Sequence, residues 1–168
     1  GIGHTRWATC GVPSSENAHP FKSMDGRIAL VHNGIIENYL ELRKELMAQG
    51  YQFSSQTDTE VLVHLVHRYM EGDLHQALRR ALKDVRGTYA IAAVEFGSDR
   101  TVVARKENPL VIGVGLGENF IASDVTAILE HTSDVIYVMD GETAIISPED
   151  ILLFSPAAQA IERQIDRI

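Results

Sequence analysis

The sequence contains only one cysteine, Cys10, in 168 residues. A single cysteine cannot form a disulfide within the chain, and it excludes a zinc site built from several cysteines. Long hydrophobic runs are also missing, since the longest apolar stretches, such as residues 110–114 and 151–154, have only the length of a strand. No basic segment followed by an apolar one opens the sequence. We therefore expect a cytoplasmic protein that has no membrane partner.

Basic residues are few, because the 15 Lys and Arg are outnumbered by the 23 Asp and Glu and the formal net charge is -8. Binding to nucleic acid needs clustered positive charge that neutralises phosphates, so this balance argues against nucleic acid as a partner. Hydrophobic residues make up 45% of the sequence, which is enough for the core of one globular domain.

Two patterns that can mark a cofactor or metal site are weak in this sequence. The glycine-rich residues 113–117 are followed by an extended pattern, whereas a dinucleotide-binding loop must open into a helix. His64 and His67 have helical spacing, but no third ligand and no His-Glu-x-x-His pattern accompany them. We therefore expect no cofactor and no metal, and we interpret both histidines as packed or solvated.

The hydrophobic pattern changes from helical to extended along the chain, which indicates an α+β fold in one domain, residues 1–168. Residues 1–27 are rich in Gly, Pro, Ser and Asn and predict loops. Three helices are predicted next, at residues 36–47, 57–69 and 73–87, the last two opened by Thr57 and Asp73 as caps. The second half predicts an antiparallel meander with a short helix at 125–131, a hairpin at Asp140-Gly141, and strands at 89–96, 101–105, 110–114, 119–122, 135–139, 142–146 and 151–154.

The stretch His32-Asn33-Gly34 joins a compact apolar run to the first predicted helix. An asparagine amide and an unhindered glycine N–H at such a junction can form an oxyanion hole, which stabilises the tetrahedral intermediate of acyl transfer. Asn-Gly is also the commonest dipeptide of tight turns. From this stretch alone, both interpretations stay open.

Arg6 and Asp58 are candidates for binding the two charged ends of an amino acid. The guanidinium of Arg6 offers a planar fork for a carboxylate, and the neighbouring Trp7 can close over a ligand as a lid, although it can equally be a core aromatic. Asp58, at the start of a predicted helix, can receive an ammonium group or simply support the helix dipole. With Asn33 and Gly34 for a reacting carbonyl oxygen, these residues suit glutamine or asparagine as a substrate.

Five separated motifs resemble, in order and spacing, the glutaminase (type 2 glutamine amidotransferase) domain of the glucosamine-6-phosphate synthase family. The motifs are His4-Thr5-Arg6-Trp7-Ala8-Thr9, Asn17-Ala18-His19-Pro20, Val31-His32-Asn33-Gly34-Ile35-Ile36-Glu37-Asn38, Thr57-Asp58-Thr59-Glu60 and Gly117-Glu118-Asn119-Phe120-Ile121-Ala122-Ser123-Asp124. The resemblance implies an N-terminal-nucleophile hydrolase fold, an αββα sandwich of antiparallel sheets, of which this chain is a truncated portion. It also implies that the domain hydrolyses L-glutamine and passes ammonia to an isomerase domain of the same parent chain, which we expect to form a homo-oligomer.

The resemblance also implies a role for each residue of the site. Asn33 and the N–H of Gly34 are the catalytic pair that forms the oxyanion hole. The implied substrate-binding residues are Arg6 for the carboxylate, Asp58 for the α-amino group, Trp7 and Thr9 on a loop that closes over glutamine, and His19 and His32 in support.

The family's nucleophile is an N-terminal cysteine that lies well upstream of the His-Thr-Arg-Trp motif, with its own α-amine as the base. Apolar and aromatic residues such as Ile2 and Trp7 stand at the start of this sequence, so we expect a fragment that lacks the nucleophile and is inactive alone. Cys10 stands where the family usually has histidine, and we interpret it as an inert side chain. Two alternatives remain open, namely a catalytically silent glutamine-binding module and the glutaminase domain of another amidotransferase.

Overall fold

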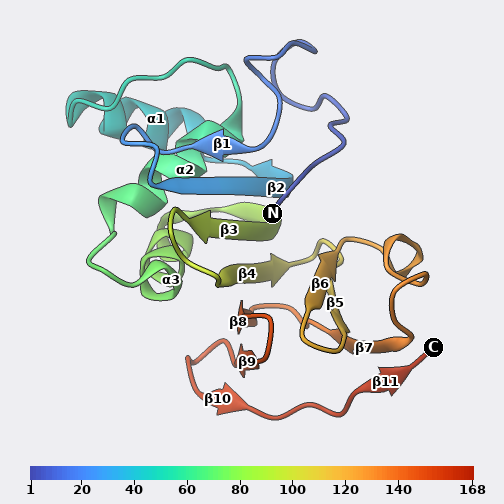
Figure 1. Cartoon of the computed structure of the whole chain (residues 1–168). Helices are drawn as coiled ribbons and strands as arrows, with labels where there is room; N and C mark the ends of the chain where they lie inside the picture. The colour runs from blue at the N-terminus through green and yellow to red at the C-terminus, as the bar shows by residue number, and fades with distance from the viewer.

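The computed structural model describes residues 1–168 and contains two antiparallel sheets. The seven-stranded sheet has the order β1-β2-β3-β4-β8-β9-β10, and the four-stranded sheet has the order β11-β7-β5-β6 (Figure 1). The strands are β1 (Phe21–Lys22), β2 (Ile28–Ile36), β3 (Gly87–Glu95), β4 (Thr101–Lys106), β5 (Val111–Val114), β6 (Asn119–Ala122), β7 (Asp134–Tyr137), β8 (Thr143–Ile146), β9 (Ile151–Phe154), β10 (Ala160–Ile161) and β11 (Asp166–Arg167).

Three helices, α1 (Tyr39–Ala48), α2 (Asp58–Arg68) and α3 (Leu74–Asp84), cover one face of the seven-stranded sheet (Figure 1). The main core lies between these helices and the sheet, and includes Ile28, Leu62 and Ile91, which are fully buried. A second cluster, which includes Val103 and Ile112, lies between the two sheets. The layers are therefore helices, sheet and sheet, and burial of apolar surface in both interfaces stabilises them.

The α+β fold with antiparallel sheets is confirmed, and so are the caps of the second and third helices. The hydroxyl of Thr57 accepts from Glu60 N–H, and the carboxylate of Asp73 accepts from the N–H groups of His75 and Gln76. The first helix begins later than predicted, because Ile36 belongs to β2 and pairs with Gly87 in β3.

The predicted hairpin at Asp140-Gly141 is wrong. Strand β7 before it pairs with β5 and β11 in the four-stranded sheet, whereas β8 after it pairs with β4 and β9 in the other sheet. The dipeptide therefore marks a crossing between sheets, and Gly141 N–H donates to Arg105 O. The strands of the second half are divided between two sheets rather than forming one meander.

The predicted helix at 125–131 is reduced to a single 3-10 turn, η1 (Val125–Ala127), capped by Asp124. This turn and Ile128 pack against Val111 and Val135 on the outer side of the four-stranded sheet. The second helical layer expected for an αββα sandwich is thus represented in residues 1–168 only by this turn. None of the helices has both the length and the hydrophobicity of a membrane-spanning segment.

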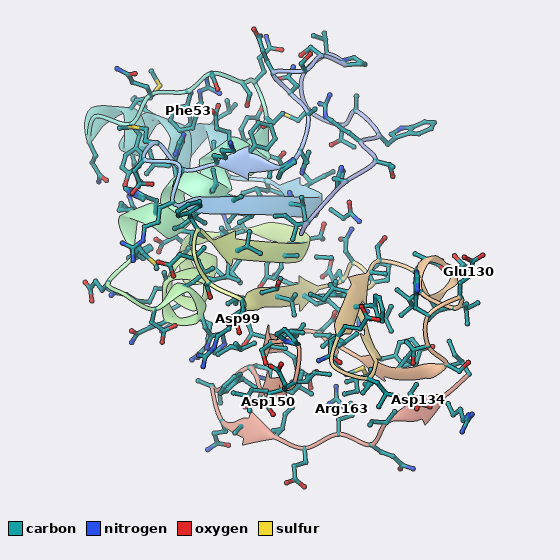
Figure 2. The ribbon with its side chains drawn as sticks, in the orientation of Figure 1. Phe53, Asp99, Glu130, Asp134, Asp150 and Arg163 are labelled. Atoms are coloured by element: carbon teal, nitrogen blue, oxygen red, sulfur yellow. The ribbon has the colours of Figure 1, made fainter.

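The last residues of the chain are fastened to the body by an ion pair. Arg163, labelled in Figure 2, lies between β10 and β11 and forms two contacts of 2.6 Å with the carboxylate of Glu142. Glu142 is buried, and these bonds from Arg163 together with Met139 N–H lower the pKa of its carboxyl against the opposing effect of burial. The buried charge is therefore paired and hydrogen-bonded, as buried carboxylates require.

Candidate active site

A cavity of about 180 Å³ lies where the N-terminal loop, strand β2 and the start of helix α2 meet. All eight residues predicted for the site line it, namely Arg6, Trp7, Thr9, His19, His32, Asn33, Gly34 and Asp58. Residues far apart in the sequence are thus brought around one small cavity. Its size is that of a small metabolite, below the range usual for drug-sized ligands.

Asn33 and Gly34 lie inside strand β2, so the interpretation of this dipeptide as a tight turn is wrong. They stand opposite Ala90 and Tyr89 in an unbroken antiparallel register with β3. Gly34 has a φ of +123°, and a Cβ at this position would lie 2.2 Å from the carbonyl oxygen of Thr88. Only glycine fits here, because it tolerates both the positive φ and the close approach of the neighbouring strand.

The ladder between β2 and β3 determines where the amide groups of this segment point. Glu37 N–H donates to Arg86 O at 2.7 Å, immediately beyond the paired residues of the two strands. Directly opposed pairs in an antiparallel ladder alternate between hydrogen-bonded and non-hydrogen-bonded. The N–H groups of residues 32, 34 and 36 therefore point away from β3.

Two of these three N–H groups have partners on that side. His32 N–H donates to Nδ1 of His19 at 3.2 Å, and Ile36 N–H donates to Oδ2 of Asp58 at 2.9 Å. Gly34 lies between them, and it lines the cavity. Its N–H is thus held on a rigid strand and directed toward the cavity.

The side chain of Asn33 adds a second donor beside this N–H. Its Oδ1 lies 2.6 Å from Nε2 of His4, whereas no group of the protein accepts a hydrogen bond from its Nδ2. Two neighbouring donors on one strand can bind the oxygen of a tetrahedral intermediate. Asn33 and Gly34 therefore present two hydrogen-bond donors to the same cavity.

His19, which is half-buried, and His32, which is buried, lie beneath this pair. His32 has both ring nitrogens engaged, with Thr59 Oγ1 at 3.1 Å and Thr88 O at 3.3 Å. Burial lowers the pKa of His32, and burial together with the nearby His4 lowers the pKa of His19 to about 3. Both imidazoles are neutral at pH 7, and they support the strand and helix without offering a charge to a ligand.

Asp58 is the first residue of α2 and is only 5% exposed. One of its carboxylate oxygens accepts from Ile36 N–H, and the residue also lines the cavity. The helix N-terminus favours a negative charge at this position. The site therefore carries a fixed anion that faces the same cavity as the two donors.

In this structure, the guanidinium of Arg6 forms hydrogen bonds within its own loop. Its guanidinium donates to the carbonyl oxygens of Cys10, Gly11 and Val12 at 2.6, 3.2 and 3.1 Å, so that the loop curls around the charge. The neighbouring Trp7 is 89% exposed and does not cover the cavity. The sequence predicts the arginine as a binding residue but does not reveal that carbonyls of its own loop accept its hydrogen bonds.

The thiol of Cys10 also lines the cavity, and it donates to Gln56 O at 3.3 Å. None of the histidine ring nitrogens forms a hydrogen bond to it. A thiol that lacks an adjacent base is a poor nucleophile. The structure thus supports the interpretation of Cys10 as part of the wall.

His4 and Thr59 are site residues to which the sequence assigned no role. Both lie inside the quoted motifs, next to residues that were given one, and that proximity was the only available signal. Thr59 Oγ1 lies between the rings of His32 and His19, at 3.1 and 3.5 Å. It links helix α2 to both histidines.

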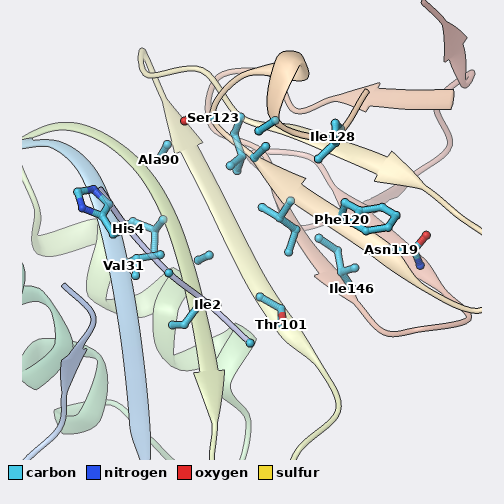
Figure 3. Close-up of a pocket in the computed structure, with 18 of the residues that line it drawn as sticks. Ile2, His4, Val31, Ala90, Thr101, Asn119, Phe120, Ser123, Ile128 and Ile146 are labelled. Atoms are coloured by element: carbon cyan, nitrogen blue, oxygen red, sulfur yellow. The ribbon is translucent and has the colours of Figure 1, made fainter. Parts of the chain in front are cut away.

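A larger cleft of about 810 Å³ opens between strands β2 to β4 of one sheet and β6 of the other, and it adjoins the cavity. Figure 3 shows Ile2, His4 and Val31 on one side of it and Phe120 and Ile128 on the other. The cleft and the cavity share four lining residues, His4, Thr5, His32 and Asn33. Asn33 is therefore accessible from both the cleft and the cavity, whereas Gly34 lines the cavity alone.

The family described as glutamine amidotransferase domain matches residues 4–130. The chain is 51% identical, over its whole length, to the glutamine–fructose-6-phosphate aminotransferase [isomerizing] of Methanosarcina acetivorans, and 51% identical over 98% of its length to that of Thermus thermophilus. It spans only 29% and 27% of the length of these relatives.

Solved structures give the same assignment for the fold. The glutamine phosphoribosylpyrophosphate amidotransferase of B. subtilis superimposes with a TM-score of 0.76 at 30% identity, covering 94% of this chain and 35% of that one. A regulatory enzyme of purine biosynthesis gives the same TM-score at 32% identity, covering 90% of this chain and 34% of its own.

Proposed function

Because the chain belongs to the glutamine amidotransferase domain family, we propose that it forms the glutamine-hydrolysing site of a larger protein that transfers the released ammonia to a sugar phosphate. The identity of about half the residues with aminotransferases named for glutamine and fructose 6-phosphate supports this choice of acceptor. Similarity to the phosphoribosylpyrophosphate amidotransferase is lower, at 30%.

The observation that carries the proposal is the pair of donors at Asn33 and Gly34 on the wall of the cavity. A thiolate that attacks the side-chain amide carbon of glutamine forms a C–S bond and moves the carbonyl electron pair onto oxygen. Asn33 Nδ2 and Gly34 N–H stabilise that oxyanion. When the intermediate collapses, the C–N bond breaks and the nitrogen leaves as ammonia, with the proton that the α-amine of the N-terminal cysteine took from the thiol. Water then hydrolyses the thioester, which releases glutamate and restores the thiol.

The charged ends of glutamine match Asp58 and Arg6. The carboxylate of Asp58 faces the cavity and accepts only one backbone N–H through Oδ2, so it can also receive an α-ammonium group. Arg6 can bind the α-carboxylate when its N–H groups turn from Cys10 and Gly11 toward the ligand. In this proposal, ligand binding reshapes the loop and brings Trp7 and Thr9 over the substrate.

We place the nucleophile, an N-terminal cysteine, on a segment outside residues 1–168. The cleft between the sheets supports this placement, because it reaches His4 and Asn33 and is far larger than the cavity itself. Its mixed apolar and polar lining suits an additional extended segment. The remaining parts of the proposal are an isomerase domain in the same parent chain, a homo-oligomeric parent and a cytoplasmic location, all supported by the family resemblance.

The test uses the protein produced from its complete gene, incubated with L-glutamine and fructose 6-phosphate. The proposal predicts glutamate and glucosamine 6-phosphate in equal amounts, measured by chromatography. Glutamate with no amino sugar would indicate another amidotransferase, and phosphoribosylpyrophosphate is then the next acceptor to try. Calorimetric binding of L-glutamine with no glutamate formed would indicate a silent binding module and contradict the proposal.

A further inference from the structure

The amide of Asn33 serves as an oxyanion donor only in one of its two orientations. Rotation by half a turn about the last side-chain bond exchanges Oδ1 and Nδ2, and an oxygen directed at an oxyanion would repel it. His4 is the only protein group that forms a hydrogen bond to this amide, with Nε2 at 2.6 Å from Oδ1. Whether Nε2 of His4 donates or accepts a hydrogen bond therefore determines which end of the Asn33 amide faces the substrate.

The other ring nitrogen of His4, Nδ1, determines which of the two nitrogens carries the proton. Nδ1 is buried and has no hydrogen-bond partner. A neutral imidazole carries its proton on one nitrogen, and a proton on Nδ1 would be a buried donor without an acceptor, which is costly. The proton thus belongs on Nε2, which must donate and so selects Oδ1 of Asn33.

The ring of His4 is itself held in place. It stacks on His19 with a centroid distance of 4.0 Å and an interplanar angle of 14°. His19 is fixed in turn by the N–H of His32 on its Nδ1 and by the edge-on ring of Phe21, with a centroid distance of 5.2 Å. The stack joins the N-terminal loop to the sheet at the point where Asn33 projects.

From this geometry we propose that His4 is a positioning residue for glutamine hydrolysis, which donates from Nε2 to Asn33 Oδ1 and so directs Nδ2 toward the oxyanion. The inference rests on the proposed function, because it assigns His4 a role in that reaction. His4 acts through Asn33 and touches no reacting atom. The substrate's charged ends are bound elsewhere, so His4 affects turnover and leaves substrate affinity unchanged.

The test compares two substitutions in the protein produced from its complete gene, after glutaminase activity of the unchanged protein is established. His4→Gln retains a donor at the end of its side chain, and His4→Phe retains the ring without a donor. We expect His4→Phe to lower kcat by about 10²–10³-fold with KM within a few-fold, since an oxyanion donor is lost. We expect His4→Gln to recover most of that loss.

Equal kcat in His4→Phe and the unchanged protein would overturn the inference, and so would equal losses in both variants. If the unchanged protein releases no glutamate, the proposed function fails instead, so the two failures are distinguishable. A measurement without substitution is available as well. The ¹⁵N NMR spectrum of the His4 ring should show a proton on Nε2, and a deprotonated Nε2 would contradict the inference even if the variants do not fold.

Discussion

The N–H of Ile36 donates a hydrogen bond of 2.9 Å to Oδ2 of Asp58, and this bond joins the end of strand β2 to the start of helix α2. The bond has two consequences. It anchors the strand whose preceding residues we assign to the oxyanion hole, and it fixes the carboxylate that we assign to the α-ammonium group of glutamine. In this proposal, one carboxylate both links strand to helix and binds the substrate.

These two duties can be separated by Asp58→Asn. The carboxamide oxygen can still accept from Ile36 N–H, but the negative charge is lost. We expect the fold to persist and KM for L-glutamine to rise by roughly ten-fold to one hundred-fold, the value of a hydrogen bond to a charged group. Asp73→Asn at the start of α3 is the matched control and should leave KM unchanged. Steady-state kinetics measures both, and an unaltered KM in Asp58→Asn would refute the assignment.

Gly34→Ala should destabilise the protein far more than a glycine substitution of similar φ elsewhere. Its Cβ would lie 2.2 Å from Thr88 O, whereas Gly72, with a φ of +89°, has open space around it. We expect a loss of about 3 kcal/mol or more for Gly34→Ala and about 1–2 kcal/mol for Gly72→Ala. Urea unfolding gives both free energies. Equal losses would show that the contact between β2 and β3 is looser than described.

The predictions of secondary structure that were confirmed depend on residues close together in the sequence, whereas those that were wrong depend on residues far apart. Thr57 and Asp73 were identified as helix caps because a cap is a contact between residues only two or three positions apart. Asn33-Gly34 and Asp140-Gly141 both have the local chemistry of turns, yet one lies inside a strand and the other crosses between sheets. The partner strand decides each case, and local sequence carries little information about that partner.

In the candidate site, too, the sequence indicated individual residues but not their contacts with distant parts of the chain. Motifs brought Asn33, Gly34 and Asp58 to attention, and the cavity places them together. The motifs did not show that Arg6 is bound by carbonyls of its own loop or that His4 contacts Asn33. Both facts depend on how a loop without periodicity packs against a distant strand.

Trp7 provides an internal probe for closure of the loop. It is the only tryptophan of the sequence and is 89% exposed. If the loop closes over L-glutamine, the indole leaves water, so its fluorescence emission should shift to shorter wavelength and its quenching by iodide should decrease. D-glutamine should produce neither change. An unchanged spectrum at a saturating concentration of L-glutamine would rule out a closing role for Trp7.

The buried histidines predict a loss of stability in mild acid. Burial lowers the pKa of His19 to about 3 and also lowers the pKa of His32 and His75 in the folded protein. In the unfolded chain, the pKa of each imidazole is about 6.5. The unfolded chain therefore binds more protons below pH 6.5, and stability falls as the pH decreases toward the folded pKa values. Urea midpoints at pH 7 and pH 5 measure this fall.

The lower limit of pH 5 is chosen so that protonation of carboxylates contributes little to the difference in stability between pH 7 and pH 5. The folded pKa values of Asp25 and Glu60 are about 2, and the stability that they contribute is lost only as the pH falls below about 4.5. His19→Gln should reduce the change in the free energy of unfolding between pH 7 and pH 5. If the dependence of stability on pH is unchanged in His19→Gln, the lowered pKa assigned to His19 is wrong.

The most direct test of the account is the rate of glutamate release by Asn33→Ala in the protein produced from its complete gene. Removal of one oxyanion donor predicts a decrease in kcat of about 10²–10³-fold with little change in KM. Asn108→Ala is the matched control, because the side chain of Asn108 lines neither the cavity nor the cleft and forms no hydrogen bond. A kcat in Asn33→Ala equal to that of the control would contradict the assignment of Asn33 and Gly34 as the oxyanion hole.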